Sequence, residues 1–361
     1  MLRSSSLVVL FCALCGCGAR ARPAGLPASG ATEESGVYLG PSRLALGRAH
    51  SCARSAGGTV HCWGANEHGQ VGVPPSAAPV AVPVEWPAKD VLLLGAAGDR
   101  TCHAVDAASR IVRCTGASAT VIEASTLYNP ASLSVSDGAV CIHQTAEYEG
   151  SRLQCDAADA AIARLARPHP CAPESLCQKR YGFQVALRGA DACLLEQNGP
   201  ASKLECTRGA GWSYDGFEVT ERANAFRAIA LGYDFACVLG VDGARCWGPA
   251  SVASSLDDAR TVTGFPEPAA ICATNTELCG IGAQGRVFCA PAGTIAAREI
   301  HLPGPSARAT EIACGDGHAC AVTTSGLVAC WGDNHMGQLG DGTRRGITDA
   351  VIARIPPLTD R

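Results

Sequence analysis

Two stretches of the sequence, near its two ends, repeat one cysteine pattern. Residues 47–72 read GRAHSCARSAGGTVHCWGANEHGQVG, and residues 315–340 read GDGHACAVTTSGLVACWGDNHMGQLG. The stretches align without a gap, so that the histidine, both cysteines, the Cys-Trp-Gly tripeptide and the Asn-x-x-Gly-Gln segment coincide. A repeat of this kind decides the fold more strongly than any single segment, because each copy folds as one supersecondary unit.

Five weaker copies lie between these two, which makes seven in all. The copy from Gly232 to Gly248 keeps the Cys-Trp-Gly tripeptide but lacks the Asn-x-x-Gly-Gln segment. The other four copies lack the tryptophan and have Thr115, Asp156, Thr207 and Ala290 in its place. The first cysteines stand at positions 52, 102, 141, 193, 237, 279 and 320, so the period is 39 to 52 residues.

Each copy is predicted to form a β-hairpin, because short apolar runs flank a turn rich in Gly, Asp and Ser. The two cysteines lie about equally far from the turn and therefore face one another, with Cα atoms about 4.5 Å apart, a distance that a disulfide can bridge. Closing a loop of about ten residues contributes about 2.7 kcal/mol in the chain-entropy model. The predicted hairpin disulfides are Cys52–Cys62, Cys102–Cys114, Cys141–Cys155, Cys193–Cys206, Cys237–Cys246, Cys279–Cys289 and Cys320–Cys330.

The N-terminus is predicted to be an export signal, with Arg3 followed by an apolar run too short to span a bilayer. Its end, Leu14-Cys15-Gly16-Cys17, resembles a bacterial lipobox, which predicts a signal peptide over residues 1–16 and lipid on Cys17. Gly18, rather than Asp, favours the outer membrane. An ordinary secretory peptide is the alternative. Residues 17–41, rich in Pro, Gly and Ala, are predicted to tether residues 42–361.

The remaining cysteines complete a scheme of nine disulfides. Cys171 and Cys177 flank five residues in the longest insertion, and Cys272 and Cys314 precede the sixth and seventh hairpins at similar places. We therefore predict Cys171–Cys177 as a local clasp and Cys272–Cys314 as a bridge between adjacent repeats. Zinc binding is the alternative for the hairpin cysteines, but no Cys-x-x-Cys follows residue 17 and histidines lie near the pairs only irregularly, so we expect no metal and no cofactor.

The composition disfavours nucleic-acid binding. The net charge is −4, and only three of the 29 basic residues are lysines, so the basic stripe that would neutralise phosphates is absent from the sequence. An apolar fraction of 47% is enough for a buried core, while 41 Gly and 21 Pro indicate many turns and short strands. The 21 cysteines favour an oxidising compartment.

Seven all-β repeats of this length predict a seven-bladed β-propeller with one cysteine-paired hairpin per blade. Six blades are the alternative if one weak copy is not a blade. The run 42–47 precedes a repeat and the run 350–356 follows one. We therefore expect the N- and C-terminal strands to close the ring within one blade split across the termini.

The repeat pattern resembles that of the regulator-of-chromosome-condensation propellers, and in particular their exported, cysteine-rich bacterial branch. The resemblance covers residues 42–361, but it is strong only in the first and last repeats. The best-known eukaryotic member promotes nucleotide exchange on a small nuclear GTPase. An export signal argues against that role here, which leaves it as a remote alternative.

The residues that the repeats share are predicted to be structural. Trp63, Trp247 and Trp331 are expected to pack between blades. His50 and His318 are expected to hydrogen-bond neighbouring loops, and Asn66, Gly69 and Gln70, with Asn334, Gly337 and Gln338, to form turns. Residues 280–285 match Gly-x-Gly-x-x-Gly, but they lie inside a cysteine hairpin and offer no helix N-terminus to a phosphate.

One segment, residues 211–222, has the composition of a contact surface. It contains three aromatic residues, three acids and an arginine in a predicted loop between repeats four and five. We name Trp212, Tyr214, Phe217 and Arg222 as candidate binding residues. Packing of these aromatics onto the blade edge is the alternative.

Together these observations predict a lipid-anchored protein of the cell envelope that is not an enzyme. Its propeller is expected to bind another protein or a surface polymer, as a monomer that contacts the membrane through its N-terminal lipid only. The alternative from another class is a lyase or glycan-active propeller with its site in the central channel. That alternative requires a cluster of His, Asp, Glu or Arg at one mouth of the channel.

Overall fold

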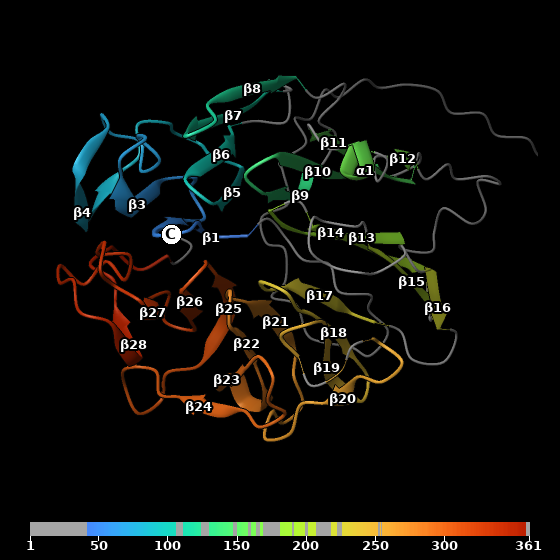
Figure 1. The fold of residues 1–361 in the computed structure, drawn as a ribbon. Coiled ribbons are helices and arrows are strands. Elements are labelled where there is room, and N and C mark those ends of the chain that lie inside the picture. Colours follow the sequence, from blue (N-terminus) through green and yellow to red (C-terminus); the bar gives the residue numbers. More distant parts are fainter. Residues whose placement is uncertain are drawn as a thin grey trace, which may run out of the picture. The chain divides into compact units, whose positions relative to one another are not determined.

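Each cysteine hairpin forms the two middle strands of a four-stranded antiparallel sheet, and seven such sheets follow one another along the chain (Figure 1). The computed structural model describes residues 42–105, 111–123, 130–146, 150–157, 160–163, 167–168, 181–189, 191–198, 201–206, 218–221, 226–251, 253 and 255–358. Among these residues, no helix is both long enough and apolar enough to cross a membrane.

The first three blades contain the first twelve strands and one short helix. They comprise β1 (Leu44–Leu46), β2 (His50–Arg54), β3 (Val60–Asn66) and β4 (Ser76–Glu85); β5 (Leu93–Ala97), β6 (Arg100–Ala104), β7 (Ile111–Gly116) and β8 (Thr120–Glu123); and β9 (Pro130–Val135), β10 (Ala139–Ala146), β11 (Gly150–Ala157), α1 (Ala160–Ala163) and β12 (Arg167–Pro168).

The last four blades have the same strand order. They comprise β13 (Tyr181–Arg188), β14 (Asp191–Asn198), β15 (Ala201–Cys206) and β16 (Glu218–Glu221); β17 (Ala228–Leu231), β18 (Ala236–Gly240), β19 (Gly243–Trp247) and β20 (Arg260–Thr261); β21 (Ala270–Ala273), β22 (Glu277–Ile281), β23 (Val287–Pro291) and β24 (Arg298–Ile300); and β25 (Ala309–Cys314), β26 (His318–Thr323), β27 (Val328–Gly332) and β28 (Ile347–Ile352).

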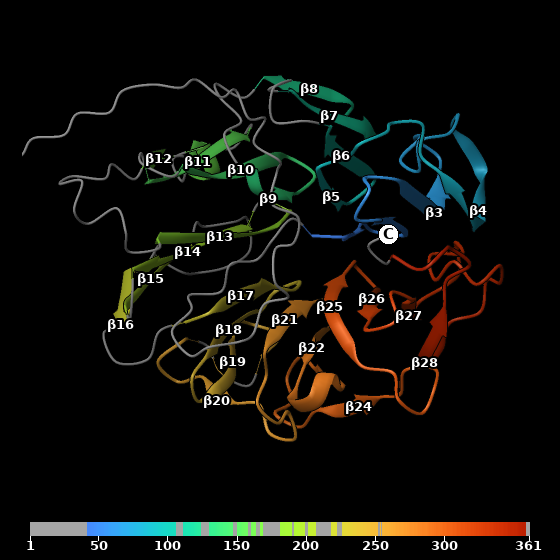
Figure 2. The same cartoon turned by 180° about the vertical axis from the view of Figure 1, so that it is seen from behind.

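The first strands of the blades form the inner wall of a closed ring. The contacts run from β1 to β5, β9, β13, β17, β21 and β25, and β25 in turn contacts β1 (Figures 1 and 2). The protein is therefore a seven-bladed β-propeller. The weak repeats two, three, four and six each supply a complete sheet, so the six-bladed alternative is wrong.

The prediction of a blade split across the termini is also wrong. Leu44 pairs with Ala53 within the first sheet, and Ile352 pairs with Ala329 within the last one, so both terminal strands stay with their own repeats. A tight turn, in which the Gly47 N–H donates to the His50 carbonyl at 2.9 Å, makes β1 the local partner of β2. A short loop of this kind costs less entropy than pairing the two ends of the chain.

Packing between whole blades closes the ring instead. The core consists of seven buried clusters, and each cluster joins two neighbouring blades. One of them joins Leu44 and Leu46 of the first blade to Val322 and Val328 of the last. Successive residues of a strand enter different clusters, since Cys52 faces the second blade and Ala53 the seventh. Both faces of each sheet are thus buried, which accounts for the nearly continuous apolar strands.

Eight disulfides join cysteines that the sequence analysis paired. Seven link the second and third strands of a blade, and their cysteines are opposite one another in the ladder with Cα atoms 4.0–4.1 Å apart. The eighth, Cys272–Cys314, links β21 to β25 and so crosses between blades. The predicted pair Cys171–Cys177 lies outside the described residues.

Candidate functional site

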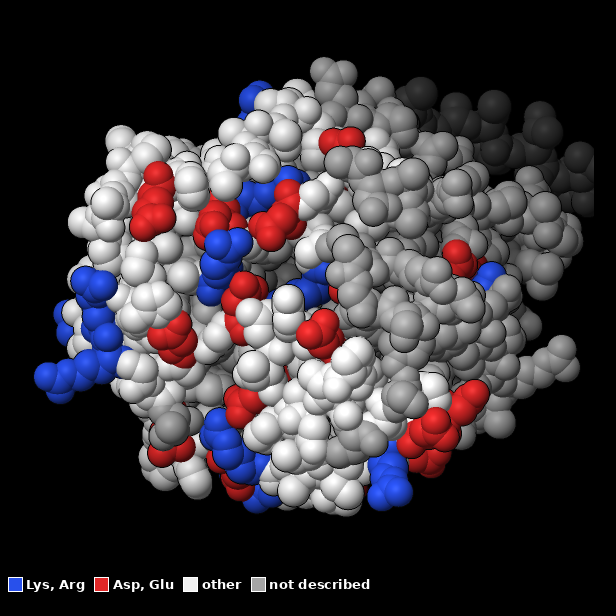
Figure 3. Space-filling view, in the orientation of Figure 1, with Lys and Arg blue, Asp and Glu red and all other residues white. Residues whose placement is uncertain are grey.

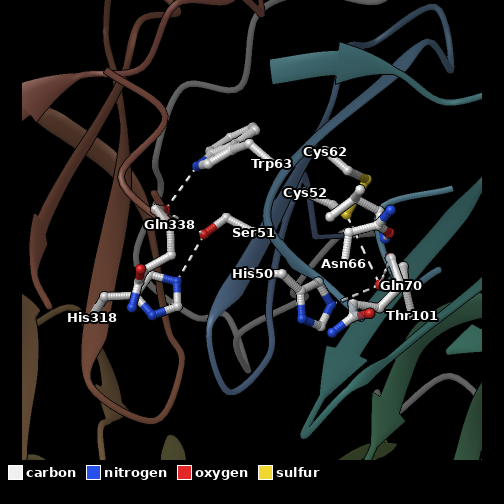
Figure 4. Close-up of a disulfide and its surroundings, with 11 residues drawn as sticks. His50, Ser51, Cys52, Cys62, Trp63, Asn66, Gln70, Thr101, His318 and Gln338 are labelled. Atoms are coloured by element: carbon white, nitrogen blue, oxygen red, sulfur yellow. Dashed lines mark hydrogen bonds between the residues drawn. A yellow bond between two sulfur atoms is a disulfide. The ribbon is translucent and has the colours of Figure 1, made fainter. Parts of the chain in front are cut away.

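The two strong repeats build a buried hydrogen-bonded seam on both sides of the first blade (Figure 4). His318 Nε2 lies 2.7 Å from Ser51 Oγ, and Ser51 Oγ donates to the Gln338 carbonyl at 2.9 Å. In the next interface, His50 Nε2 lies 2.8 Å from Thr101 Oγ1, which donates to the Gln70 carbonyl at 2.8 Å. The histidine of one blade thus contacts the hydroxyl that precedes the first cysteine of the next blade.

These histidines are structural rather than catalytic. Each hydroxyl hydrogen is already donated to a carbonyl, so the histidine Nε2 must carry the proton and donate to the hydroxyl oxygen. Burial lowers the pKa of His50 to about 3 and the pKa of His318 to about 4, which keeps both rings neutral. Ser51 and His318 are 0% and 1% exposed, so no substrate reaches this Ser–His pair.

The tryptophans lie in the same interfaces, as predicted. Trp63 shares a buried cluster with the Cys320–Cys330 disulfide of the preceding blade, and its Nε1–H donates to the Gln338 carbonyl at 2.7 Å. Trp247 and Trp331 likewise share clusters with the disulfide cysteines of the blades before them. The second blade has Thr115 at this position, and Trp86 fills that interface from the first blade.

The Asn-x-x-Gly-Gln segments form the turns that the sequence indicated. The Asn334 side-chain oxygen accepts from the Leu339 N–H at 3.0 Å, and the Gln338 side-chain oxygen accepts from the Met336 N–H at 2.9 Å. Asn66 and Gln70 make the equivalent bonds in the first blade. These residues therefore fix the loop that carries the carbonyl acceptor of the seam.

A chain of backbone hydrogen bonds runs along one mouth of the central channel, where the turns between first and second strands meet. The N–H of Tyr233 donates to Asn275, that of Asn275 to Asp316, and that of Asp316 to Gly47, over 3.2, 2.7 and 3.3 Å. The Arg48 N–H then donates to the Gly98 carbonyl at 2.6 Å. The turns of five consecutive blades are thus bonded to one another, and we call this rim the channel mouth.

Charged side chains of both signs stand on the channel mouth. Arg48 contacts Asp99 at 3.1 Å and Asp316 at 3.9 Å, and Arg188 contacts Asp316 at 3.5 Å. Asp137, in the corresponding turn of the third blade, is exposed. Figure 3 shows acidic and basic side chains interleaved around the centre of one face. The mouth therefore has the charged groups that a binding or catalytic site would require.

The inner strands themselves offer little chemistry. They are mainly apolar, as in Leu44–Leu46 and Ala228–Leu231, and several of their polar side chains bond the next blade. Ser134 Oγ donates to the Val185 carbonyl at 2.8 Å, and the Gln184 side-chain oxygen accepts from the Ile229 N–H at 2.9 Å. On the described part of this channel wall, the mouth therefore offers more groups for binding than the inner strands do.

The other predicted sites have different outcomes. Cys17 and the candidate binding residues Trp212, Tyr214, Phe217 and Arg222 lie outside the described residues. β16 contains residues 218–221 of the predicted contact segment and pairs with β15, so this part of the segment belongs to the fourth blade and does not lie between two blades, as the sequence had suggested. The Gly-x-Gly-x-x-Gly stretch is a hairpin connection containing a three-residue 3-10 turn, which offers no phosphate site. In the described chain, the metal-ligand geometry of Glu277, Cys279 and Cys289 involves two disulfide sulfurs, which are not thiolates.

Sequence reasoning missed the channel mouth. A signal was present, because Arg48, Tyr233, Asn275 and Asp316 each precede the first hairpin cysteine of their repeat by four residues. Aligning the seven repeats on that cysteine would have placed these polar residues at one level of the ring. The residues that are identical between repeats form the seams instead.

Comparison with known proteins agrees with the fold. The protein-family model of the regulator of chromosome condensation (RCC1) repeat matches residues 42–70 and 309–338, in the first and last blades. A search of curated protein sequences found no match.

Solved structures with this fold include two plant receptor-kinase ectodomains. The CRINKLY WD40 ectodomain of Arabidopsis thaliana ACR4 is 16% identical with a TM-score of 0.53, over 85% of this chain and 97% of that one. The ectodomain of Physcomitrella patens CR4 is 16% identical with a TM-score of 0.52, over 81% and 72%. Prp20p from Saccharomyces cerevisiae, described with its binding to Gsp1p and histones, is 17% identical with a TM-score of 0.42, over 86% and 76%. These likenesses concern the fold alone.

Proposed function

We propose that this propeller, with RCC1 repeats on both sides of its ring closure, is an exported, non-catalytic scaffold that binds a protein or a surface polymer at the channel mouth. The observation that carries the proposal is the combination of a bonded rim and exposed side chains. Tyr233 is 67% exposed, and the Arg48 side chain is 57% exposed. Tyrosine and arginine are enriched among the residues that dominate binding energy at protein interfaces. A rim held by backbone hydrogen bonds presents them with little loss of entropy on binding.

The ends of the two strands that flank the aromatic segment in the sequence support keeping it as a candidate. A connection from third to fourth strand leaves a blade at the same end as the turn from first to second strand. In the fourth blade, Cys206 ends β15 opposite Cys193, close to the turn between Arg188 and Asp191. Trp212 and Tyr214 follow β15 in the sequence, and they remain candidate contacts.

The export and anchoring of the chain are part of the proposal. Eight disulfides are typical of an oxidising compartment. The sequence Leu14-Cys15-Gly16-Cys17 supports lipid attachment at Cys17, and Gly18 supports the outer membrane of a bacterial envelope. Cys17→Ser should release the protein from the membrane fraction or leave an uncleaved precursor. Unchanged mass and membrane partitioning would rule out lipidation.

The test of binding is capture of partners from envelope extract, followed by affinity measurement with variants. Arg48→Ala and Tyr233→Ala should each weaken the captured complex tenfold or more, about 1.4 kcal/mol. The matched control is Val241→Ala, because Val241 is 59% exposed at a turn between second and third strands, on the opposite face. Full affinity in both mouth variants, with an unchanged melting temperature, would place binding elsewhere.

An enzyme acting at the same mouth is the second candidate function. The observation that favours it is the pairing of Asp99 and Asp316 with Arg48 and Arg188. An enzyme would turn over an envelope polymer and lose that activity in Asp316→Asn. The scaffold hypothesis expects no turnover of purified envelope glycans by the wild-type protein.

A further inference from the structure

The Cys272–Cys314 disulfide differs from the hairpin disulfides in what it joins. Cys272 lies in β21 and Cys314 in β25, the inner strands of the sixth and seventh blades. The other disulfides of the described chain each stay within one sheet. Cys272–Cys314 is therefore the disulfide, among the described residues, that crosses between blades.

Its accessibility also differs. Both Cys272 and Cys314 are half-buried at the edge of the cluster between these blades. Each hairpin disulfide has a first cysteine that is 3% exposed or less. Exchange requires a thiolate to approach one sulfur while the other sulfur leaves. Access to both cysteines therefore makes the disulfide between blades more reactive toward a thiol.

The surroundings of the two kinds of disulfide respond differently to cleavage. After cleavage of a hairpin disulfide, the cysteines remain opposite one another in a hydrogen-bonded ladder, with Cα atoms about 4 Å apart as in Cys320–Cys330, where the distance is 4.1 Å. That proximity favours rapid closure. Cys272 and Cys314 have Cα atoms 5.6 Å apart, and side-chain packing holds their two strands together. Their thiols separate when the blades shift slightly.

We propose that Cys272–Cys314 is a thiol–disulfide exchange site, which a dithiol reductant opens before any described hairpin disulfide. One thiolate of the dithiol attacks a cysteine sulfur, the sulfur–sulfur bond breaks, and the other cysteine leaves as a thiolate that takes up a proton. The second thiol of the dithiol then displaces the protein sulfur. Two electrons pass from the dithiol to the protein, which gains two thiols while the reductant becomes a disulfide.

Opening this site loosens one seam and leaves every blade intact. The four strands of the sixth sheet and the four strands of the seventh sheet keep their hydrogen-bonded ladders, because the disulfide joins the two sheets and lies within neither. Other contacts in this seam include the apolar cluster around Ile281, Ala321 and Trp331 and backbone bonds such as Asn275 N–H to Asp316 carbonyl. The latter belongs to the channel mouth, so reduction acts next to the proposed binding surface without rebuilding it.

The test is graded reduction of the native, full-length mature protein with dithiothreitol, followed by alkylation and peptide mass spectrometry. Cys272 and Cys314 should become half-labelled at a dithiothreitol concentration at least tenfold below that needed for the cysteines of the seven hairpin pairs. Labelling of any of these hairpin pairs first, or of all eight pairs together, would overturn the proposal. This measurement uses the wild-type chain and needs no variant to fold.

Two double variants give matched controls. Cys272→Ala with Cys314→Ala should remove the first reduction step and leave the later steps in place. Cys279→Ala with Cys289→Ala, which removes the neighbouring hairpin disulfide, should preserve the first step. A first step that survives in Cys272→Ala/Cys314→Ala would show that another disulfide is the labile one.

Discussion

At the scale of single residues, the glycine and the histidine of each Gly-x-x-His segment, in the first and in the last repeat, pack together as a unit. A Cβ atom on Gly47 would lie 2.1 Å from His50 Cε1, and one on Gly315 would lie 2.5 Å from His318 Cε1. Each imidazole therefore occupies the space that a side chain at the glycine would need. Because glycine has no side chain, the imidazole can reach the hydroxyl of the next blade. This explains the spacing of three residues between the glycine and the histidine in the repeat.

Gly47→Ala should therefore destabilise the protein by about 1–3 kcal/mol, the usual cost of overpacking a core. The added methyl group also meets the Gly98 carbonyl oxygen at 2.7 Å, so movement of the imidazole alone does not relieve the clash. Denaturant unfolding measures the effect. Gly57→Ala is the control, because its Cβ meets nothing closer than 4.0 Å, and it should change stability by less than about 0.5 kcal/mol. Equal effects of the two substitutions would contradict the packing argument.

The buried histidines also predict a pH dependence. Their pKa values fall from 6.5 to about 3 for His50 and about 4 for His318, so the unfolded chain binds more protons between these values. The contribution of these histidines to the free energy of unfolding is fully present above pH 6.5. It is lost as the pH falls toward 4, by up to about 1.4 kcal/mol per pH unit for each histidine. His318→Gln should flatten the pH profile of unfolding between pH 6.5 and 4.5. An unchanged slope would mean that His318 is protonated in the folded state.

At the scale of elements, one carboxylate attaches β1 to the last blade. Glu311 Oε1 accepts from the backbone N–H groups of Arg43 and Leu44 at 2.7 and 3.1 Å, and Oε2 accepts from Arg43 Nε at 3.0 Å. These bonds hold the start of the first strand against β25. They add to the packing between the first and last blades that closes the ring.

Glu311→Gln should lower the free energy of unfolding by about 1.5 kcal/mol, because hydrogen bonds to a charged acceptor are stronger than those to a neutral one. The matched control is Glu299→Gln, which removes a single 3.5 Å contact with Arg286 between more exposed side chains. That change should stay below about 0.5 kcal/mol. A similar loss of unfolding free energy in both variants would show that the hydrogen bonds to Glu311 contribute no more than a surface ion pair.

Most of the architecture could be predicted from the sequence, because one cysteine pair marked the two middle strands of every blade. Even where Trp is replaced by Thr115 or Ala290, the spacing alone located the sheet. The manner of closure could not be predicted, because the runs 42–47 and 350–356 are compatible with pairing either locally or with one another. The tight turn from Gly47 to His50 and the bonds from Glu311 to the start of β1 distinguish the two.

At the scale of the whole molecule, the channel mouth was harder to predict than the fold. Its residues are four different types, Arg48, Tyr233, Asn275 and Asp316, at one repeat position. Structural positions in a repeat protein converge on one residue type because each interface poses the same packing problem. Positions facing a ligand differ from blade to blade, so they carry no repeated signal.

Disulfide mapping of the mature protein by mass spectrometry under non-reducing conditions examines whether one hairpin and one disulfide define each blade of the closed ring. We expect seven links within hairpins, such as Cys52–Cys62 and Cys320–Cys330, the link Cys272–Cys314 between blades, and no free thiol after denaturation. A link between hairpin cysteines of different blades, or two or more free cysteines, would contradict it.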